Sequence, residues 1–203
     1  MFRSADHQWD LPTAGLSAVL LKIDDLQKRI GTISALSKRG KDNNTYQASR
    51  KEFETVDLVT LDSNGLRLQN SELEGLQHHF KGSDCERFNG IGDILQTPLS
   101  ATTAYLQAPC WLAAYNAGGT ALLVRRTGNG ELRVSDAPDG EFANGKITSS
   151  MKVRGLGDCW TIDEWVWNGE DLIRSLSLDT GRCKGFGGGA WSIPSIHRHV
   201  KAR

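Results

Sequence analysis

Short apolar segments separated by turn residues fill the chain from Thr97 onward, and this pattern constrains the fold more than any other feature. Dipeptides such as Asn144-Gly145 and Asn168-Gly169 mark tight hairpins, because asparagine and glycine accept the positive φ that these turns require. Further turns are predicted at 116–119 and 127–130. The strands predicted between the turns are 103–108, 111–115, 120–126, 131–135, 146–154, 161–167 and 171–178. Strands joined by such short turns pair antiparallel, so the sequence predicts an antiparallel meander.

Helical periodicity is confined to the N-terminal half of the chain. Apolar residues recur at steps of three and four from 16 to 30, which predicts an amphipathic helix with Thr13 as its N-cap and Gly31 as its stop. The run Ser71-Glu72-Leu73-Glu74 has the pattern of a capping box and predicts a second, shorter helix that ends near Gly82.

The fold class expected from these elements is α+β. A short strand at 32–37 and a bulged strand at 53–61, whose apolar residues alternate imperfectly, complete the N-terminal half. We expect one α+β domain over 1–203, in which the two helices pack on the antiparallel meander. Within it, 10–108 is expected to be helical or mixed and 109–200 rich in strands.

Four cysteines, an even number, indicate disulfide bonds. Cys85 and Cys110 are 25 positions apart, and Cys159 and Cys183 are 24 positions apart. Four cysteines allow three connectivities, and we favour these sequential pairs because each brackets a short stretch of predicted strand. Closing each loop would stabilise the fold by roughly 3 kcal/mol. No Cys-x-x-Cys knuckle is present, so a structural zinc site is not expected.

Disulfides persist outside the cytosol, so the paired cysteines predict a periplasmic or otherwise extracellular bacterial protein. The alternative is four buried thiols in a cytosolic protein, since cysteine is also a common core residue. The first residues, Met1 to His7, lack the charged, apolar and small-residue regions of a signal peptide. We therefore expect that the signal was removed or that upstream sequence is missing.

Charge and hydropathy exclude two classes of function. The 203 residues include 24 basic and 24 acidic side chains, so the chain has no net charge to draw it towards nucleic acid or an anionic membrane. No apolar run approaches the roughly 18 residues of a membrane-spanning helix.

Several blocks together resemble the bacterial family known as domain of unknown function 1176. They are the run Leu20 to Thr32, Pro109-Cys110-Trp111 with Ala114-Tyr115-Asn116, Gly157-Asp158-Cys159-Trp160, Trp165-x-Trp167-Asn168-Gly169, and Cys183-x-Gly185 to Gly189-x-Trp191. The resemblance implies an exported protein with a signal peptide and further cysteines in an N-terminal part, so the chain would correspond to a C-terminal portion. It brings no activity, cofactor or catalytic residue.

Tryptophans near the C-terminus are the candidate binding residues. Trp160, Trp165, Trp167 and Trp191 lie within the last 44 residues, and Trp165 and Trp167 share one face of a predicted strand. Such side chains stack on sugars or anchor protein partners. The alternative is a core packed around the second cysteine pair.

Carboxylates surround these tryptophans. Asp163 and Glu164 are included in the candidate binding face, and together with Asp158 they are the acid and base candidates of a glycoside hydrolase. Acidic residues beside hairpin turns, among them Glu170 and Asp171, are equally expected as solvated turn residues. We name no catalytic residue.

Neither a metal nor a cofactor is expected. Adjacent His78 and His79 point about 100° apart on a helix, so they do not form the pair that a metal prefers. His197 and His199 lie in a basic tail, 197–203, that is expected to be frayed. The glycine-rich run 185–190 does not open a helix, so it is interpreted as a tight loop held by its neighbouring cysteine and not as a phosphate loop.

The function expected from the sequence is that of a non-enzymatic, exported envelope protein that binds a protein partner, as an inhibitor or immunity factor does. The alternative is a hydrolase that acts on the cell wall or another glycan, using the carboxylates near the tryptophans. Nucleic-acid partners and a transmembrane segment are not expected.

Overall fold

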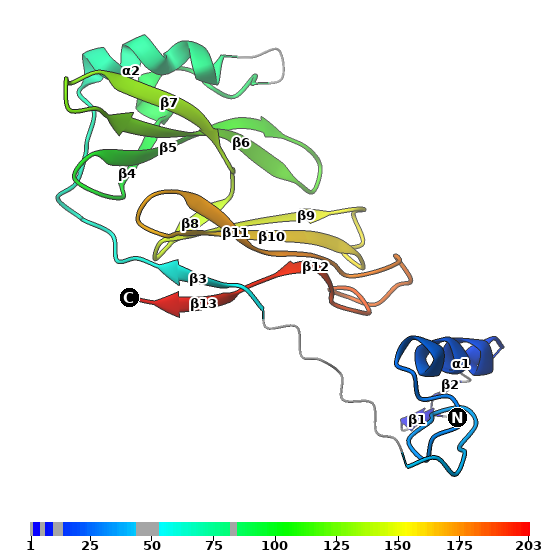
Figure 1. Ribbon diagram of the computed structural model, residues 1–203. Coiled ribbons are helices and arrows are strands. Elements are labelled where there is room, and N and C mark those ends of the chain that lie inside the picture. The colour runs from blue at the N-terminus through cyan, green and yellow to red at the C-terminus, as the bar shows by residue number, and fades with distance from the viewer. Residues whose placement is uncertain (1, 5–6, 10–13, 44–52, 82–84) are drawn as a thin grey trace. The chain divides into compact units, whose positions relative to one another are not determined.

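A computed structural model describes residues 2–4, 7–9, 14–43, 53–81 and 85–203 (Figure 1). The chain divides into two units, 1–52 and 53–203. The expected subdivision after residue 108 falls inside a strand, β5 (Thr103–Leu112). None of the helices in the described residues is long and apolar enough to cross a membrane. That the whole chain forms one domain stays a prediction.

The first unit contains an antiparallel pair of strands, β1 (Phe2–Ser4) and β2 (His7–Trp9), and helix α1 (Leu16–Leu26). Gly15, at φ 82°, precedes the helix, whereas the predicted N-cap, Thr13, lies outside the described residues. The helix ends at Leu26 and not near residue 30, because the chain leaves the helical conformation at Lys28, whose φ is 51°.

The strand predicted at 32–37 is wrong, because a buried carboxylate holds this segment as a series of turns. Asp24 of α1 is 1% exposed and accepts the backbone N–H groups of Leu36 and Ser37 at 2.9 Å each. Burial alone would raise the pKa of Asp24, but these two hydrogen bonds and nearby Arg29 outweigh burial and lower it. The helix therefore buries a charge, and its packing on the meander stays a prediction. The exposed apolar residues of this unit include Leu16, Val19, Leu21, Leu26, Ile30, Ile33 and Leu36.

The second unit contains two antiparallel sheets and a parallel strand pair. The first sheet has the order β4 (Leu95–Pro98), β5, β6 (Ala117–Arg126), β7 (Leu132–Ala137). The second has the order β12 (Ile193–His197), β11 (Leu172–Asp179), β10 (Trp160–Trp167), β9 (Lys146–Lys152), β8 (Glu141–Ala143). Strand β3 (Thr55–Leu58) pairs in parallel with β13 (His199–Ala202). The helices are α2 (Asn70–Leu76) and the short 3₁₀ segments η1 (Gln77–Phe80) and η2 (Ile91–Asp93). The predicted α+β class is confirmed.

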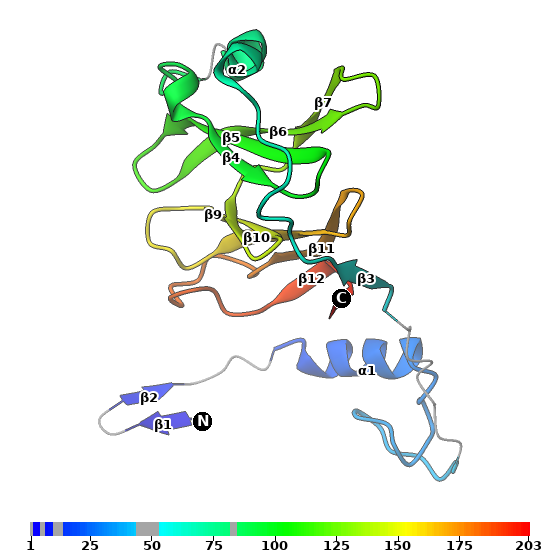
Figure 2. The same ribbon diagram turned by 90° about the vertical axis from the view of Figure 1, so that its left-hand side faces the viewer.

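These elements form layers, with α2 across one face of the first sheet and the second sheet on its other side (Figures 1 and 2). Alternate residues of β5 point into the two layers: Leu106 joins a core with α2, whereas Tyr105 joins a core between the sheets. The core with α2 consists of Leu66, Leu68, Leu73, Leu76, Phe80, Ile94, Ala104, Leu106, Ala108, Leu122 and Val124. The core between the sheets consists of Leu99, Tyr105, Ala121, Leu123, Ile147 and Trp167. Because the first sheet is buried on both faces, its central strands are almost continuously apolar.

Two predictions around strand β5 are wrong, namely its division into two strands and the position of the turn that follows it. The strands predicted at 103–108 and 111–115 are one strand, which continues through a bulge at Cys110. The connecting turn is not 116–119, because the Ala113 N–H donates to the carbonyl of Asn116 at 2.8 Å and closes the turn three residues earlier. The glycines that the sequence assigned to this turn lie within β6.

The capping box of α2 lies two residues earlier than predicted. The Gln69 N–H donates to the Glu72 carboxylate at 2.9 Å, and the Gln69 side chain accepts the backbone N–H of Glu72. Glu72 also pairs with Arg126 of β6 at 2.8 Å, which fixes the helix on the sheet. The Gln69 hydrogen bond, followed by this ion pair, lowers the pKa of Glu72. Ser71 and Glu74 are therefore not the cap.

The first and last segments of the second unit pair with each other as strands. The bulged strand predicted at 53–61 is the four-residue strand β3, and the tail 197–203, expected to be frayed, supplies β13 as its partner. Arg203 pairs with Asp57 at 2.9 Å. The pairing joins residues that are about 140 positions apart, so no local pattern predicts it. Strands β4, β8 and β12 were also not predicted.

Both predicted disulfides, Cys85–Cys110 and Cys159–Cys183, are confirmed. The first attaches the segment before η2 to the bulge of β5, and the second attaches the glycine-rich loop to the start of β10.

Candidate functional site

The four candidate tryptophans do not share one surface. Trp167 is 1% exposed and belongs to the core between the sheets, with Trp165 packed against that core. The Trp165 ring also lies 5.4 Å from the guanidinium of Arg174. Both side chains therefore contribute to the packing between the sheets, whereas the alternative had placed the tryptophans in a core around the second cysteine pair.

The other two tryptophans flank the glycine-rich loop. The Trp160 Nε1–H donates to the Gly157 carbonyl at 2.9 Å, and the Lys152 ammonium lies 5.3 Å from the Trp160 ring. Trp191 lies over Gly181 and is 69% exposed, so it is the candidate that remains open to a ligand.

Asp158 has a structural position beside the second disulfide. It is 2% exposed, pairs with the Arg154 guanidinium and accepts the Gly185 N–H at 2.5 Å. The Arg154 hydrogen bond, followed by the Gly185 N–H and the charge of Arg154, lowers the pKa of Asp158 well below its ordinary value. A general acid needs a raised pKa, so this geometry suits a clip on the glycine-rich loop better than proton donation.

The other acidic candidates are separate from one another. Asp163 pairs with Arg174 on the neighbouring strand, and Asp171 pairs with Arg125 at 2.7 Å. The Glu170 carbonyl accepts a hydrogen bond from the same arginine. Glu164 lies beside Asp163 in β10, so the two side chains point to opposite faces of the strand.

One group of ligand-type side chains occurs in the described residues, and its chemistry does not suit a metal. Asp158, Cys159 and Cys183 place one atom each within 4.8 Å of one another. Both sulfurs belong to the disulfide, so neither is a thiolate that could bind an ion.

The histidines occupy two separate places. In η1, His78 contacts the Gly75 carbonyl at 2.8 Å, and its ring centroid lies 4.0 Å from that of His79 with the two planes tilted. Near the C-terminus, the rings of His197 and His199 lie 4.8 and 5.3 Å from the ring of Phe53.

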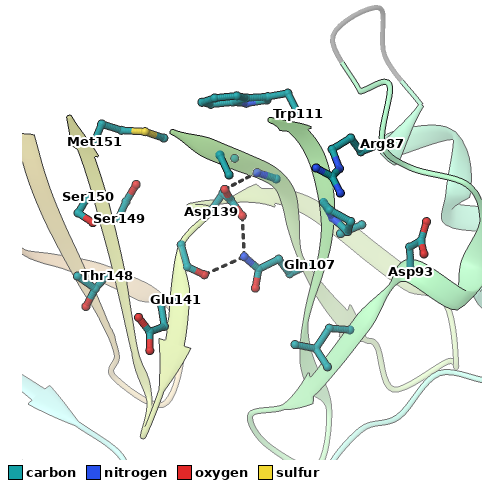
Figure 3. A pocket seen from close by; sticks show the side chains of 17 residues that line it. Arg87, Asp93, Gln107, Trp111, Asp139, Glu141, Thr148, Ser149, Ser150 and Met151 are labelled. Carbon is teal, nitrogen blue, oxygen red and sulfur yellow. Dashed lines mark hydrogen bonds between the residues drawn. The ribbon is translucent and has the colours of Figure 1, made fainter. Parts of the chain in front are cut away.

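A cavity lies elsewhere, between the ends of the two sheets (Figure 3). We call it the inter-sheet groove. Its volume of about 610 Å³ is within the range of ligand-binding clefts. Its walls come from β5 and β6 of the first sheet, β8 and β9 of the second, and the corner 138–140 that joins them. The lining residues are Arg87, Asp93, Leu95, Gln107, Ala108, Pro109, Trp111, Ala117, Gly118, Gly119, Asp139, Gly140, Glu141, Thr148, Ser149, Ser150 and Met151.

Asp139 organises the floor of the groove. Its carboxylate accepts the Gly119 N–H at 2.5 Å and the Gln107 side-chain amide at 2.7 Å, and the same amide donates to the Gly140 carbonyl (Figure 3). The Tyr105 hydroxyl donates to the Pro138 carbonyl at 2.9 Å and fixes the same corner. Burial, followed by the charge of Asp139, raises the pKa of Tyr105, which therefore stays a hydroxyl donor at neutral pH.

Glycines bring the walls close together. A Cβ at Gly118 would lie 2.6 Å from the indole of Trp111, so this ring lies directly over the β6 backbone. A Cβ at Gly119 would lie 2.5 Å from the Ala108 carbonyl oxygen, and one at Gly140 would lie 2.5 Å from that of Thr148. These glycines therefore permit close approach of the backbone, a role distinct from supplying positive φ in turns.

The groove carries more acidic than basic groups. Arg87 is its basic residue, and Asp93, Asp139 and Glu141 are acidic. Asp93 already accepts hydrogen bonds from Asn89, whereas Glu141 is exposed and has no hydrogen bond or ion pair within the described residues. Glu141 is therefore available to a ligand.

Sequence reasoning missed the groove because its residues come from segments that are far apart in the sequence. Trp111 belonged to a recognised block, but Gly118 and Gly119 were assigned to a turn, and the turn signal Pro138-Asp139-Gly140 was passed over. The adjacent glycines in an otherwise strand-like segment were the available sign of close backbone approach.

Comparison with known proteins identifies a family for this chain. A family model described as "Protein of unknown function (DUF1176)" matches residues 1–198. No curated protein and no solved structure matches the chain.

Proposed function

The chain belongs to the DUF1176 family of proteins of unknown function, and on that premise we propose that it is an exported, non-enzymatic binding protein of the bacterial envelope. Its binding site for a partner protein is the inter-sheet groove. The observation that carries this proposal is the groove itself, a cavity of about 610 Å³ with Trp111 over one wall and Glu141 unpaired on another.

The state of the carboxylates favours binding over hydrolysis. A hydrolase that uses two carboxylates needs one protonated acid and one free base or nucleophile at a fixed separation. Asp158 has a lowered pKa and an arginine partner, and Asp163 is paired with another arginine. In the groove, Asp139 is engaged by hydrogen bonds from both walls.

The two disulfides support an exported location, because such bonds persist in oxidising compartments. The first joins a loop to strand β5 and the second joins a loop to the residue before β10, which suits a protein that keeps its shape outside the cell.

Site-specific photo-crosslinking tests the proposal. A photoreactive amino acid is placed at Met151, which faces the groove, and in parallel at Arg133, which is exposed on β7 and does not line it. The oxidised protein is then irradiated in an envelope extract of the bacterium that encodes it. We expect one partner to be crosslinked from position 151 and not from 133, and to be lost when Trp111→Ala is added.

The folded state of each variant is checked by thermal unfolding. Equal crosslinking from both positions, or crosslinking that persists in Trp111→Ala, would show that the groove is not the binding site. Release of new reducing ends from peptidoglycan by the purified protein alone would favour the hydrolase.

A further inference from the structure

Two strand edges lose their neighbours at the inter-sheet groove. Strand β6 pairs with β7 only as far as Ala121, opposite Ala137, and β9 pairs with β8 only as far as Thr148, opposite Glu141. The corner 138–140 carries the chain from one sheet to the other, so both strands run on beyond it without a partner strand on this side.

The free edge of β9 is centred on Ser150. In an antiparallel pair, the N–H and C=O groups of successive residues point alternately to the two neighbouring strands. Thr148 faces β8, and Lys152 faces away from β10 because its N–H and C=O bond the side-chain amide of Asn116, each at 2.9 Å. Ser150, between them, therefore directs its N–H and C=O into the groove. Within the described residues neither group has a partner there.

The free edge of β6 follows the same rule. Ala121 faces β7, and the Gly119 N–H faces the groove, where it binds Asp139. Ala117 is therefore also directed into the groove, and no partner for its N–H or C=O is found on this side among the described residues.

At two positions along these edges, side chains make the hydrogen bonds that a neighbouring strand would make. The Asn116 amide imitates a peptide group at Lys152, and the Asp139 carboxylate does so at Gly119. Proteins usually cover or blunt an open strand edge, because it pairs readily with other chains. Here the two ends are covered and the centre is open.

We propose that the inter-sheet groove takes up a short extended segment of the partner protein as an added strand, bound by the backbone of Ser150 and Ala117. This deepens the proposed function and rests on it. Strand addition takes its affinity from main-chain hydrogen bonds and its specificity from alternate side chains.

Charge specifies the segment further. The acidic excess of the groove and the unpaired, exposed carboxylate of Glu141 select a lysine or arginine in the segment. The exposed part of the Trp111 ring provides a second contact for such a cation.

The probe is the blocked peptide acetyl-Thr-Val-Thr-Lys-Thr-Val-Thr-amide, compared with its central glutamate counterpart. Binding to the full, oxidised chain is measured by NMR, together with hydrogen exchange of the Ser150 amide. We expect the lysine peptide to slow this exchange and to bind at least tenfold more tightly than the glutamate peptide. Glu141→Gln is expected to remove that preference.

Ser150→Pro is the decisive variant, because it removes the groove-facing N–H without removing a hydrogen bond to β10. We expect it to weaken binding of the lysine peptide by about tenfold, since the main-chain hydrogen bond that this N–H donates is lost. Ser150→Ala keeps the backbone and is expected to bind within twofold of the wild type. Asp136→Pro is the matched control, because Asp136 directs its N–H away from β6 on the outer edge of β7.

Unchanged binding in Ser150→Pro, or binding without protection of the Ser150 amide, would overturn strand addition. Self-association of the chain that is lost in Ser150→Pro would do the same, because the occupant would then be a second copy. If the partner crosslinks from Met151 but tolerates Ser150→Pro, strand addition fails while the proposed function stands. If neither crosslinking nor peptide binding depends on the groove, the proposed function and strand addition are both wrong.

Discussion

The two disulfides should stabilise the protein by nearly equal amounts, and this prediction can be worked out from the loops that they close. The paired cysteines are separated by 25 and 24 positions. The chain-entropy relation, applied to loops of this length at 25 °C, gives about 3.5 kcal/mol for each bond. Loop length enters only as a logarithm, so the difference between the two bonds should be less than about 0.1 kcal/mol.

The assay is urea unfolding of the oxidised protein at neutral pH, followed by tryptophan fluorescence, since five of the six tryptophans lie in 53–203. The double variant Cys85→Ala/Cys110→Ala is compared with Cys159→Ala/Cys183→Ala. We expect each to lose about 3.5 kcal/mol of unfolding free energy and to show a larger m-value, because the unfolded chain becomes less compact.

The structure offers a specific way for this reasoning to fail. Cys159 adjoins the buried carboxylate of Asp158, whose hydrogen bond to Gly185 depends on the position of the glycine-rich loop. A loss in the Cys159/Cys183 variant that exceeds the other by more than about 1.5 kcal/mol, with unchanged m-values, would refute the entropic account. It would show instead that the second disulfide stabilises the native state through this contact.

Three further outcomes are expected from urea unfolding. Phe80→Ala should cost about 3–5 kcal/mol, because this fully buried ring fills the core between α2 and the first sheet, and a loss below about 1 kcal/mol would contradict that packing. Gly119→Ala should cost about 1–3 kcal/mol, because the added methyl would lie 2.5 Å from a backbone oxygen. Gly118→Ala should cost less, because its added methyl would meet only the side-chain ring of Trp111. A larger loss in Gly118→Ala than in Gly119→Ala would be inconsistent with the groove geometry. Acid should lower the free energy of unfolding as the pH falls below about 4, because the Arg154 hydrogen bond lowers the pKa of Asp158 in the folded protein and the stabilisation from this carboxylate is lost as the pH falls below the ordinary carboxyl pKa. Asp158→Asn should flatten this pH dependence. An unchanged slope in that variant would be evidence against this role of Asp158.

Local chemistry explains which elements were predictable. The turn at Asn144-Gly145 and the strands β9, β10 and β11 follow from residues close together in the sequence, and they form where expected. The cysteine pairing was likewise recoverable, because each pair brackets its own strand region. Helix α1 begins after Gly15 and not after the predicted N-cap, Thr13, and its apolar repeat continued past the point where Lys28 leaves the helical conformation.

The site could not be predicted in the same way. The most conspicuous residues near the C-terminus are tryptophans, and one of them, Trp167, is buried in the core between the sheets. The groove depends instead on Asp139 and Gln107, which are ordinary residues until the corner 138–140 brings them together. A search for chemically unusual residues therefore selects packing residues and passes over the ones that shape the cavity.

The sequence by itself determined the α+β class, the two disulfides, the absence of net charge and the family resemblance, because turn chemistry, cysteine spacing and composition act within short stretches of chain. The tertiary structure alone decided that the strands divide into two sheets, that the C-terminal tail pairs with β3, and that β6 and β9 are left with open edges facing one another. The physical reason is that strand pairing joins backbone groups of any sequence, so which edges are covered and which stay free depends on the path of the chain and not on the side chains that it carries.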